Sequence, residues 1–120
     1  MPNWQPNWNN VRWDWGAADE AVNALRRAAD FLDGSVLERM SVAREAQQEW
    51  RGRFREQFDL ELGRIVARAR DLAAQFREAA GRIASASQRA YEEQRHREAE
   101  RARWQREKEE EERRRRRQRR

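Results

Sequence analysis

The sequence contains no cysteine, and it has few prolines, few glycines and a single histidine. Without cysteine the chain forms no disulfides and no thiolate metal sites, so cysteine usage implies no redox compartment. Few helix breakers and 41% charged residues are typical of a helical chain rather than of a sheet domain. No apolar run approaches the roughly 18 residues of a transmembrane helix, and no Sec-type signal is visible at the N-terminus. We therefore predict one all-α domain followed by a charged tail.

Two long stretches carry apolar residues at alternating steps of three and four, which is the spacing of a helix with one apolar seam. The first covers about residues 17–49 and is interrupted at Arg39, and the second starts near Arg53. Because the connection at 50–52 is short, the two helices are expected to fold back as an antiparallel hairpin. The seams are formed by Val22, Leu25, Ala29, Leu32, Val36, Ala43, Ala46 and Trp50, with Met40 beside Arg39, and then by Phe58, Leu62, Ile65, Ala69, Leu72, Phe76, Ala79, Ile83, Ala86 and Ala90.

Asp33-Gly34-Ser35, followed by Glu38, offers an alternative in which the first helix breaks and a capping box starts a new one. We favour a continuous helix, because the step from Leu32 to Val36 keeps the seam in register. Gly34 then costs roughly 1 kcal/mol relative to alanine.

Residues 1–16 form an N-terminal arm in which Pro2 and Pro6 oppose regular structure. Asp14 is a candidate cap for the first helix. Exposed indoles are costly in water, so we expect the arm to dock on the hairpin's open face, on a partner subunit or on a membrane interface. Docking near the start of the first helix, within the chain or on a partner, is the expectation that we favour. The indoles belong to Trp4, Trp8, Trp13 and Trp15.

The net charge of +5 is concentrated in the tail, residues 92–120, which hold 13 basic and 9 acidic residues, against 14 and 13 in residues 1–91. Acid-before-base pairs four residues apart, such as Glu110 with Arg114, favour a solvated helix, although a disordered tail is the alternative. The arginine block is a candidate contact for nucleic acid or another acidic partner, and it comprises Arg113, Arg114, Arg115, Arg116, Arg117, Arg119 and Arg120.

A two-helix hairpin of this size buries little apolar surface. A single small core rarely contributes more than about 3–5 kcal/mol of stability. Apolar residues outside the seams, such as Phe31, Leu37 and Val66, widen the stripes and provide a second face. We therefore predict that two hairpins dimerise into a four-helix bundle, with a lone hairpin as the alternative. The predicted hairpin or dimer interface comprises Val22, Leu25, Leu32, Val36, Met40, Leu62, Ile65, Leu72, Phe76 and Ile83.

Two helices that meet at Trp50-Arg51-Gly52, with Phe58 six residues after the glycine, resemble the WXG superfamily of small type VII secretion proteins. The resemblance covers about residues 17–91. It implies antiparallel hairpins that pair as homodimers or heterodimers, either with another WXG-like protein or with a larger effector. Trp50 and Gly52 correspond to the turn that forms part of the family's export signal.

The resemblance also implies residence in the cytoplasm before export by a non-Sec route. The family's tail motif, Tyr-x-x-x-Asp/Glu, is absent, because Tyr91 is followed four residues later by Arg95. Either a partner supplies the missing signal, or this chain accompanies a larger effector as its secretion partner.

The sequence gives no indication of an enzyme. His96, the one histidine, lies in the charged tail between Glu92 and Glu100 without a neighbouring nucleophile. No cofactor motif and no metal-ligand cluster is present. The alternative to a secretion role is a coiled-coil adaptor whose arginine-rich end binds nucleic acid or another acidic partner.

Overall fold

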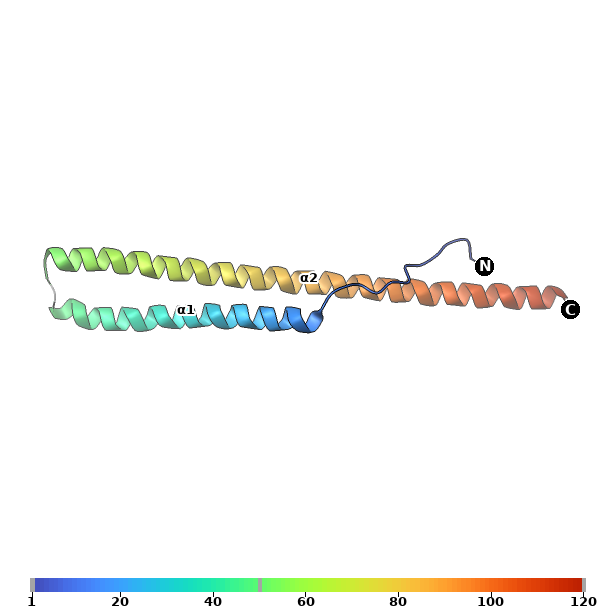
Figure 1. Ribbon diagram of the computed structural model, residues 1–120, viewed down its shortest axis with the longest axis horizontal. Helices are drawn as coiled ribbons and strands as arrows, with labels where there is room; N and C mark the ends of the chain where they lie inside the picture. The colour runs from blue at the N-terminus through green and yellow to red at the C-terminus, as the bar shows by residue number, and fades with distance from the viewer. Residues whose placement is uncertain (1, 50, 120) are drawn as a thin grey trace. The chain divides into compact units, whose positions relative to one another are not determined.

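The computed structural model describes residues 2–49 and 51–119, which fold into two α-helices without strands (Figure 1). Helix α1 spans Trp15–Glu49 and helix α2 spans Arg53–Arg119. The predicted all-α hairpin is confirmed. Helix α1 begins at Trp15 rather than at residue 17, and it continues without a break through Gly34, as the unbroken seam predicts.

Gly52 enables the reversal between the two helices. Its φ angle is +87°, a left-handed conformation that is strained for residues with a Cβ atom. The amide of Glu56 donates to the carbonyl oxygen of Gly52 at 3.2 Å, which closes the first turn of α2. The expected role of Trp50 lies outside the described residues, so the Trp-x-Gly turn as a whole stays a prediction.

The chain divides into two compact units. The hairpin unit comprises Gly16–Ala84, where α1 packs against the first part of α2. The arm–tail unit combines the N-terminal arm, up to Trp15, with the chain from Ser85 onward. The tail is helical as far as Arg119.

Small side chains form the core of the hairpin unit. Ala29, Ala73 and Ala80 have no exposed surface, and Val36 is 4% exposed. Alanines at the contact allow two helices to approach closely. Larger predicted seam residues are only half-buried, namely Leu25, Leu32, Met40, Leu62, Phe76 and Ile83, whereas Val22 is buried.

At three positions of α2 the more buried residue lies one place after the predicted seam residue, whereas other predicted seam residues, such as Phe76, are half-buried as predicted. The prediction runs through Ile65, Leu72 and Ala79, but the structure buries Ala73 and Ala80 and leaves Ile65 45% exposed. Leu72 is 41% exposed. The physical reason is that α2 carries two adjacent apolar lines, and α1 packs against the line with the smaller side chains, which permits closer contact.

Candidate interaction surfaces

The two edges of the hairpin unit differ in chemistry, and the first is polar. Arg77 of α2 donates to Asp30 at 3.0 Å and to Asp33 at 2.5 Å, both on α1. These hydrogen bonds with Asp33 and Asp30 raise the pKa of Arg77. Gln47 of α1 donates to Asp59 of α2 at 2.6 Å. Polar contacts therefore join the helices along this polar edge.

Helix geometry determines which residues lie on the edge opposite the polar edge. Consecutive residues of an α-helix are rotated by about 100°, so residues before and after a buried position lie on opposite sides of it. Asp30 follows buried Ala29 in α1, and Arg77 follows half-buried Phe76 in α2. Because Asp30 and Arg77 meet, the following positions of both antiparallel helices share the polar edge. The preceding positions of both helices must share the other edge.

That other edge carries several large exposed apolar side chains, although it also holds Glu45, Gln57, Gln75 and Arg82, which precede half-buried residues too. Its members each precede a buried or half-buried seam residue, and they include Ile65 and Leu72, the two predicted interface residues that the hairpin does not bury. Val42 is 67% exposed and Phe31, which precedes Leu32, is 76% exposed. Leu37, 68% exposed, is an apolar residue on the polar edge. We define the apolar edge as Ala21, Ala28, Phe31, Ser35 and Val42 of α1 with Ile65, Leu72 and Ala79 of α2.

The region beside the turn is also apolar and open. Phe54 is 80% exposed, while Phe58, the aromatic residue of the WXG-like pattern, is half-buried. Both side chains line a concavity of about 520 Å³, together with Glu49, Arg51, Gln57 and Glu61. The turn therefore presents aromatic surface next to charged groups.

In the arm–tail unit, main-chain groups of the arm bind polar side chains of α2. The amide of Val11 donates to Gln94 at 2.8 Å. The guanidinium of Arg101 donates to the carbonyl oxygens of Asn7 at 2.9 Å and Asn9 at 2.7 Å. Arg97 adds a bond of 3.1 Å to the Asn9 carbonyl oxygen. An extended arm without ladder partners thus has its backbone groups satisfied by side chains.

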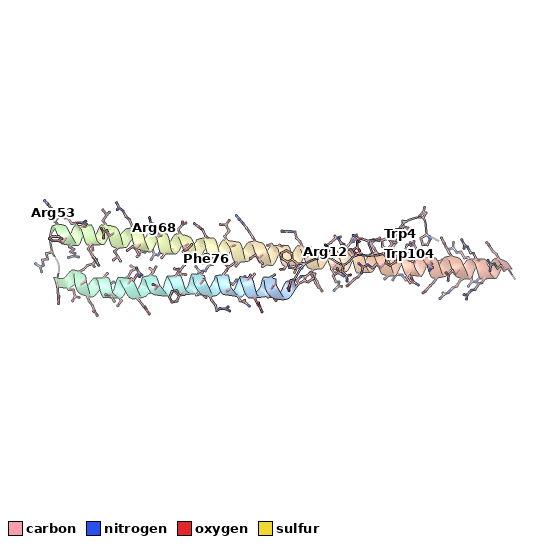
Figure 2. The ribbon with its side chains drawn as sticks, in the orientation of Figure 1. Trp4, Arg12, Arg53, Arg68, Phe76 and Trp104 are labelled. Atoms are coloured by element: carbon pink, nitrogen blue, oxygen red, sulfur yellow. The ribbon has the colours of Figure 1, made fainter. Side chains whose placement is uncertain are left out.

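Indoles at both ends of the arm complete the attachment. Trp4 donates to Glu107 at 2.6 Å and lies 4.8 Å from the guanidinium carbon of Arg103, a cation–π distance. In Figure 2, Trp4 of the arm lies beside the part of α2 that carries Trp104. At the other end, Trp13 and Trp15 donate to the hydroxyl and the carbonyl oxygen of Ser87, at 2.9 and 3.1 Å.

Trp104 is the buried centre of this attachment. It is 7% exposed and meets Trp8 edge-to-face, with ring centroids 5.2 Å apart and an interplanar angle of 88°. The ammonium of Lys108 lies 5.4 Å from the Trp104 ring. The predicted docking of the arm is therefore intramolecular. Trp13 and Trp15 dock on Ser87 at the start of α1, as expected, and the attachment continues along α2 as far as Glu107.

The pKa of Glu107 depends on contact with the arm. The hydrogen bond from Trp4 lowers the pKa of Glu107, and the neighbouring Arg103 lowers it further. The ionised carboxylate is the form that accepts the indole N–H best. Attachment of the arm at Trp4 is therefore strongest when Glu107 is charged.

The predicted arginine block forms the exposed last turns of α2 as far as Arg119, and Arg120 lies outside the described residues. Arg114 pairs with Glu110 at 2.9 Å, one of the predicted pairs four residues apart. His96 and Tyr91 are exposed, and Arg95 donates to the Tyr91 hydroxyl at 3.0 Å. Among the described residues there is no cluster of metal-ligand side chains and no helix able to cross a membrane.

Comparison with family models, curated proteins and solved structures finds no match to this chain.

Proposed function

We propose that the protein is a non-enzymatic, WXG-like type VII secretion substrate, or the secretion partner of a larger effector, which acts by helical-bundle dimerisation. The observation that carries the proposal is the apolar edge of the hairpin unit, where Ile65 and Leu72 remain exposed beside a core of alanines. The fold agrees with the family's antiparallel hairpin, and Gly52 stands at the turn with a positive φ.

The energetics favour a partner hairpin. Full burial of an aliphatic or aromatic side chain stabilises a protein by about 1.5–3 kcal/mol, and the only buried residues described in the hairpin unit are alanines and valines. A second hairpin on the apolar edge would cover Phe31, Val42, Ile65 and Leu72 together. The polar edge, occupied by the Arg77–Asp30 and Arg77–Asp33 pairs, offers no comparable gain. A four-helix bundle formed through the apolar edge is therefore the favoured assembly.

The decisive experiment compares the producing bacterium with a derivative that lacks the type VII secretion ATPase. If the chain is a substrate, it appears in the culture medium of the parent and stays inside the derivative. If it is a secretion partner, its deletion from the parent abolishes release of one type VII effector. A chain that is retained in the parent, and whose deletion leaves every type VII effector exported, contradicts the proposal.

The role of the apolar edge is tested in the same strains with Ile65→Glu/Leu72→Glu. We expect this variant to lose export, or to lose support of the effector, because carboxylates would be buried against the partner hairpin. Ala67→Glu/Ala74→Glu is the matched control, since both positions are exposed and follow rather than precede a seam residue. Equal loss in the two variants would mean that the apolar edge has no special role.

A further inference from the structure

Two arginines interrupt the apolar edge at the same level. Arg39 precedes half-buried Met40 in α1, and Arg68 precedes half-buried Ala69 in α2, so both belong to that edge by the same helix geometry. Contacts between the helices show which residues lie at the same level, that is, at the same height along the hairpin: Arg77 is level with Asp30 and Asp33, and Asp59 is level with Gln47. Position 68 lies midway between 59 and 77, so Arg68 is level with Arg39. Figure 2 labels Arg68 on α2.

Neither Arg39 nor Arg68 has its charge paired with a carboxylate of the described hairpin. Both are exposed, and neither forms an ion pair among the described residues, whereas Arg77 on the polar edge binds two carboxylates. A guanidinium that enters an interface loses water and needs a carboxylate or a similar acceptor there. The position of these arginines therefore constrains what can cover the apolar edge.

A second copy of this chain covers the edge poorly. If the two turns lie at the same end, the Arg39 and Arg68 levels of both copies coincide and four guanidiniums meet. If the turns lie at opposite ends and the edges overlap fully, the arginines face the region of Ala28 and Ala79, which supplies no carboxylate.

Two acidic residues, Glu45 and Glu61, lie on the same edge, because they precede half-buried Ala46 and Leu62. Both lie nearer the turn, at about the same level. A second copy could bring either carboxylate against Arg39 only by sliding toward the turn, which would uncover Ala21 and Ala28. Charge pairing and full coverage therefore exclude each other in a homodimer.

We infer that the occupant of the apolar edge is a different helical hairpin, with an apolar facing surface and carboxylates opposite Arg39 and Arg68. This inference rests on the proposed function and specifies the partner's chemistry. The two arginines then act as specificity determinants that disfavour self-association and select an acidic partner.

The test measures self-association of the full chain by size-exclusion chromatography with light scattering over a range of concentrations. Arg39→Leu/Arg68→Leu is expected to dimerise at a concentration at least tenfold lower than the wild-type chain, because the edge becomes continuously apolar. The matched control is Arg44→Leu/Arg70→Leu, which removes one exposed arginine from each helix outside the apolar edge. Its self-association should equal that of the wild type.

A second measurement uses Arg39→Glu/Arg68→Glu as an acidic probe. Mixed with the wild-type chain, it should form a one-to-one dimer, seen by native mass spectrometry, at a concentration where neither chain alone associates. A mixture that stays monomeric overturns the assignment of an acidic partner.

The remaining outcomes separate this inference from the proposed function. A wild-type chain that is already a tight dimer, and is not tightened by the leucine substitutions, overturns the inference and leaves a homodimeric secretion protein. Failure of both the wild type and Arg39→Leu/Arg68→Leu to associate overturns the inference, because the two arginines would then not be what prevents self-association, and the export experiment still decides the proposed function. Equal association of the edge variant and the control also overturns the inference, because the effect would then be nonspecific.

Discussion

Different interactions stabilise the hairpin unit and the arm–tail unit. In the hairpin unit, alanine and valine are the buried seam residues, the larger seam residues are half-buried, and further large apolar side chains lie exposed beside the seam. In the arm–tail unit, an extended segment attaches to a highly charged helix through hydrogen bonds and a buried tryptophan. The comparison shows that a charged tail can bury an aromatic residue and bind a segment specifically, while an apolar hairpin leaves much of its apolar surface open.

The largest effect is expected from removal of the Trp104 ring. Truncation of a buried tryptophan to alanine typically costs about 3–5 kcal/mol, through lost burial and the cavity that remains. We expect Trp104→Ala to release the arm while the hairpin unit keeps its structure. Protection of backbone amides from hydrogen exchange in residues 3–14 and in α1 measures the two effects separately.

Tyr91→Ala is the control for that experiment, since Tyr91 is 48% exposed and lies on the same helix. Loss of protection in α1 equal to the loss in the arm would contradict the separation of the two units.

Overpacking of the hairpin core should have the next largest effect. Ala73 has no exposed surface, so Ala73→Leu forces α1 and α2 apart and should destabilise the hairpin by about 1–3 kcal/mol. The neighbouring Ala74 is exposed, so Ala74→Leu should be nearly neutral. Chemical denaturation followed by circular dichroism compares the two, and equal midpoints would mean that Ala73 is not at the contact.

Lower pH should loosen the arm more than the hairpin. The folded-state pKa of Glu107 is depressed, so its contribution is present above the ordinary pKa of 4.5 and is lost as the pH falls through the depressed value. We expect the NMR signal of the Trp4 indole N–H to shift toward that of a free indole below the ordinary glutamate range. Glu107→Gln should show no such acid-dependent step. An identical titration in both chains would mean that ionisation of Glu107 does not affect attachment of Trp4.

The smallest effect is expected at the polar edge. Arg77→Met removes ion pairs with Asp30 and Asp33, but these groups are largely exposed and solvent screens them. The variant should lose less stability than Ala73→Leu, and the difference from wild type should shrink toward about 1 M salt. Thermal melts at low and high salt test this, and a loss that does not depend on salt would indicate a packing role for the side chain.

Much of the fold could be predicted from sequence because alternating three- and four-residue spacing reports a helix directly. The continuous helix through Gly34 follows from the unbroken step between Leu32 and Val36. The side of α2 that faces α1 could not be predicted from spacing alone. Ile65–Val66 and Leu72–Ala73 are adjacent apolar residues, and spacing alone does not tell which line faces α1. The preference for close approach at alanine decides it.

Most of the binding site of the arm was missed because its signal is not apolar. Arg97 and Trp104 are seven residues apart, as are Ser87 and Gln94, so these residues recur along one side of α2. A search for apolar periodicity passes over a line made of serine, glutamine and arginine. Side-chain donors and acceptors at heptad spacing could have indicated a surface for an extended backbone.

The claim that the apolar edge mediates dimerisation of the hairpin can be checked by adding Leu72→Glu to Arg39→Leu/Arg68→Leu. The molar mass from size-exclusion light scattering should be that of a dimer for the arginine variant and that of a monomer once the carboxylate is present at Leu72. A dimer that persists with Leu72→Glu would contradict the claim, because association would then use a surface other than the apolar edge.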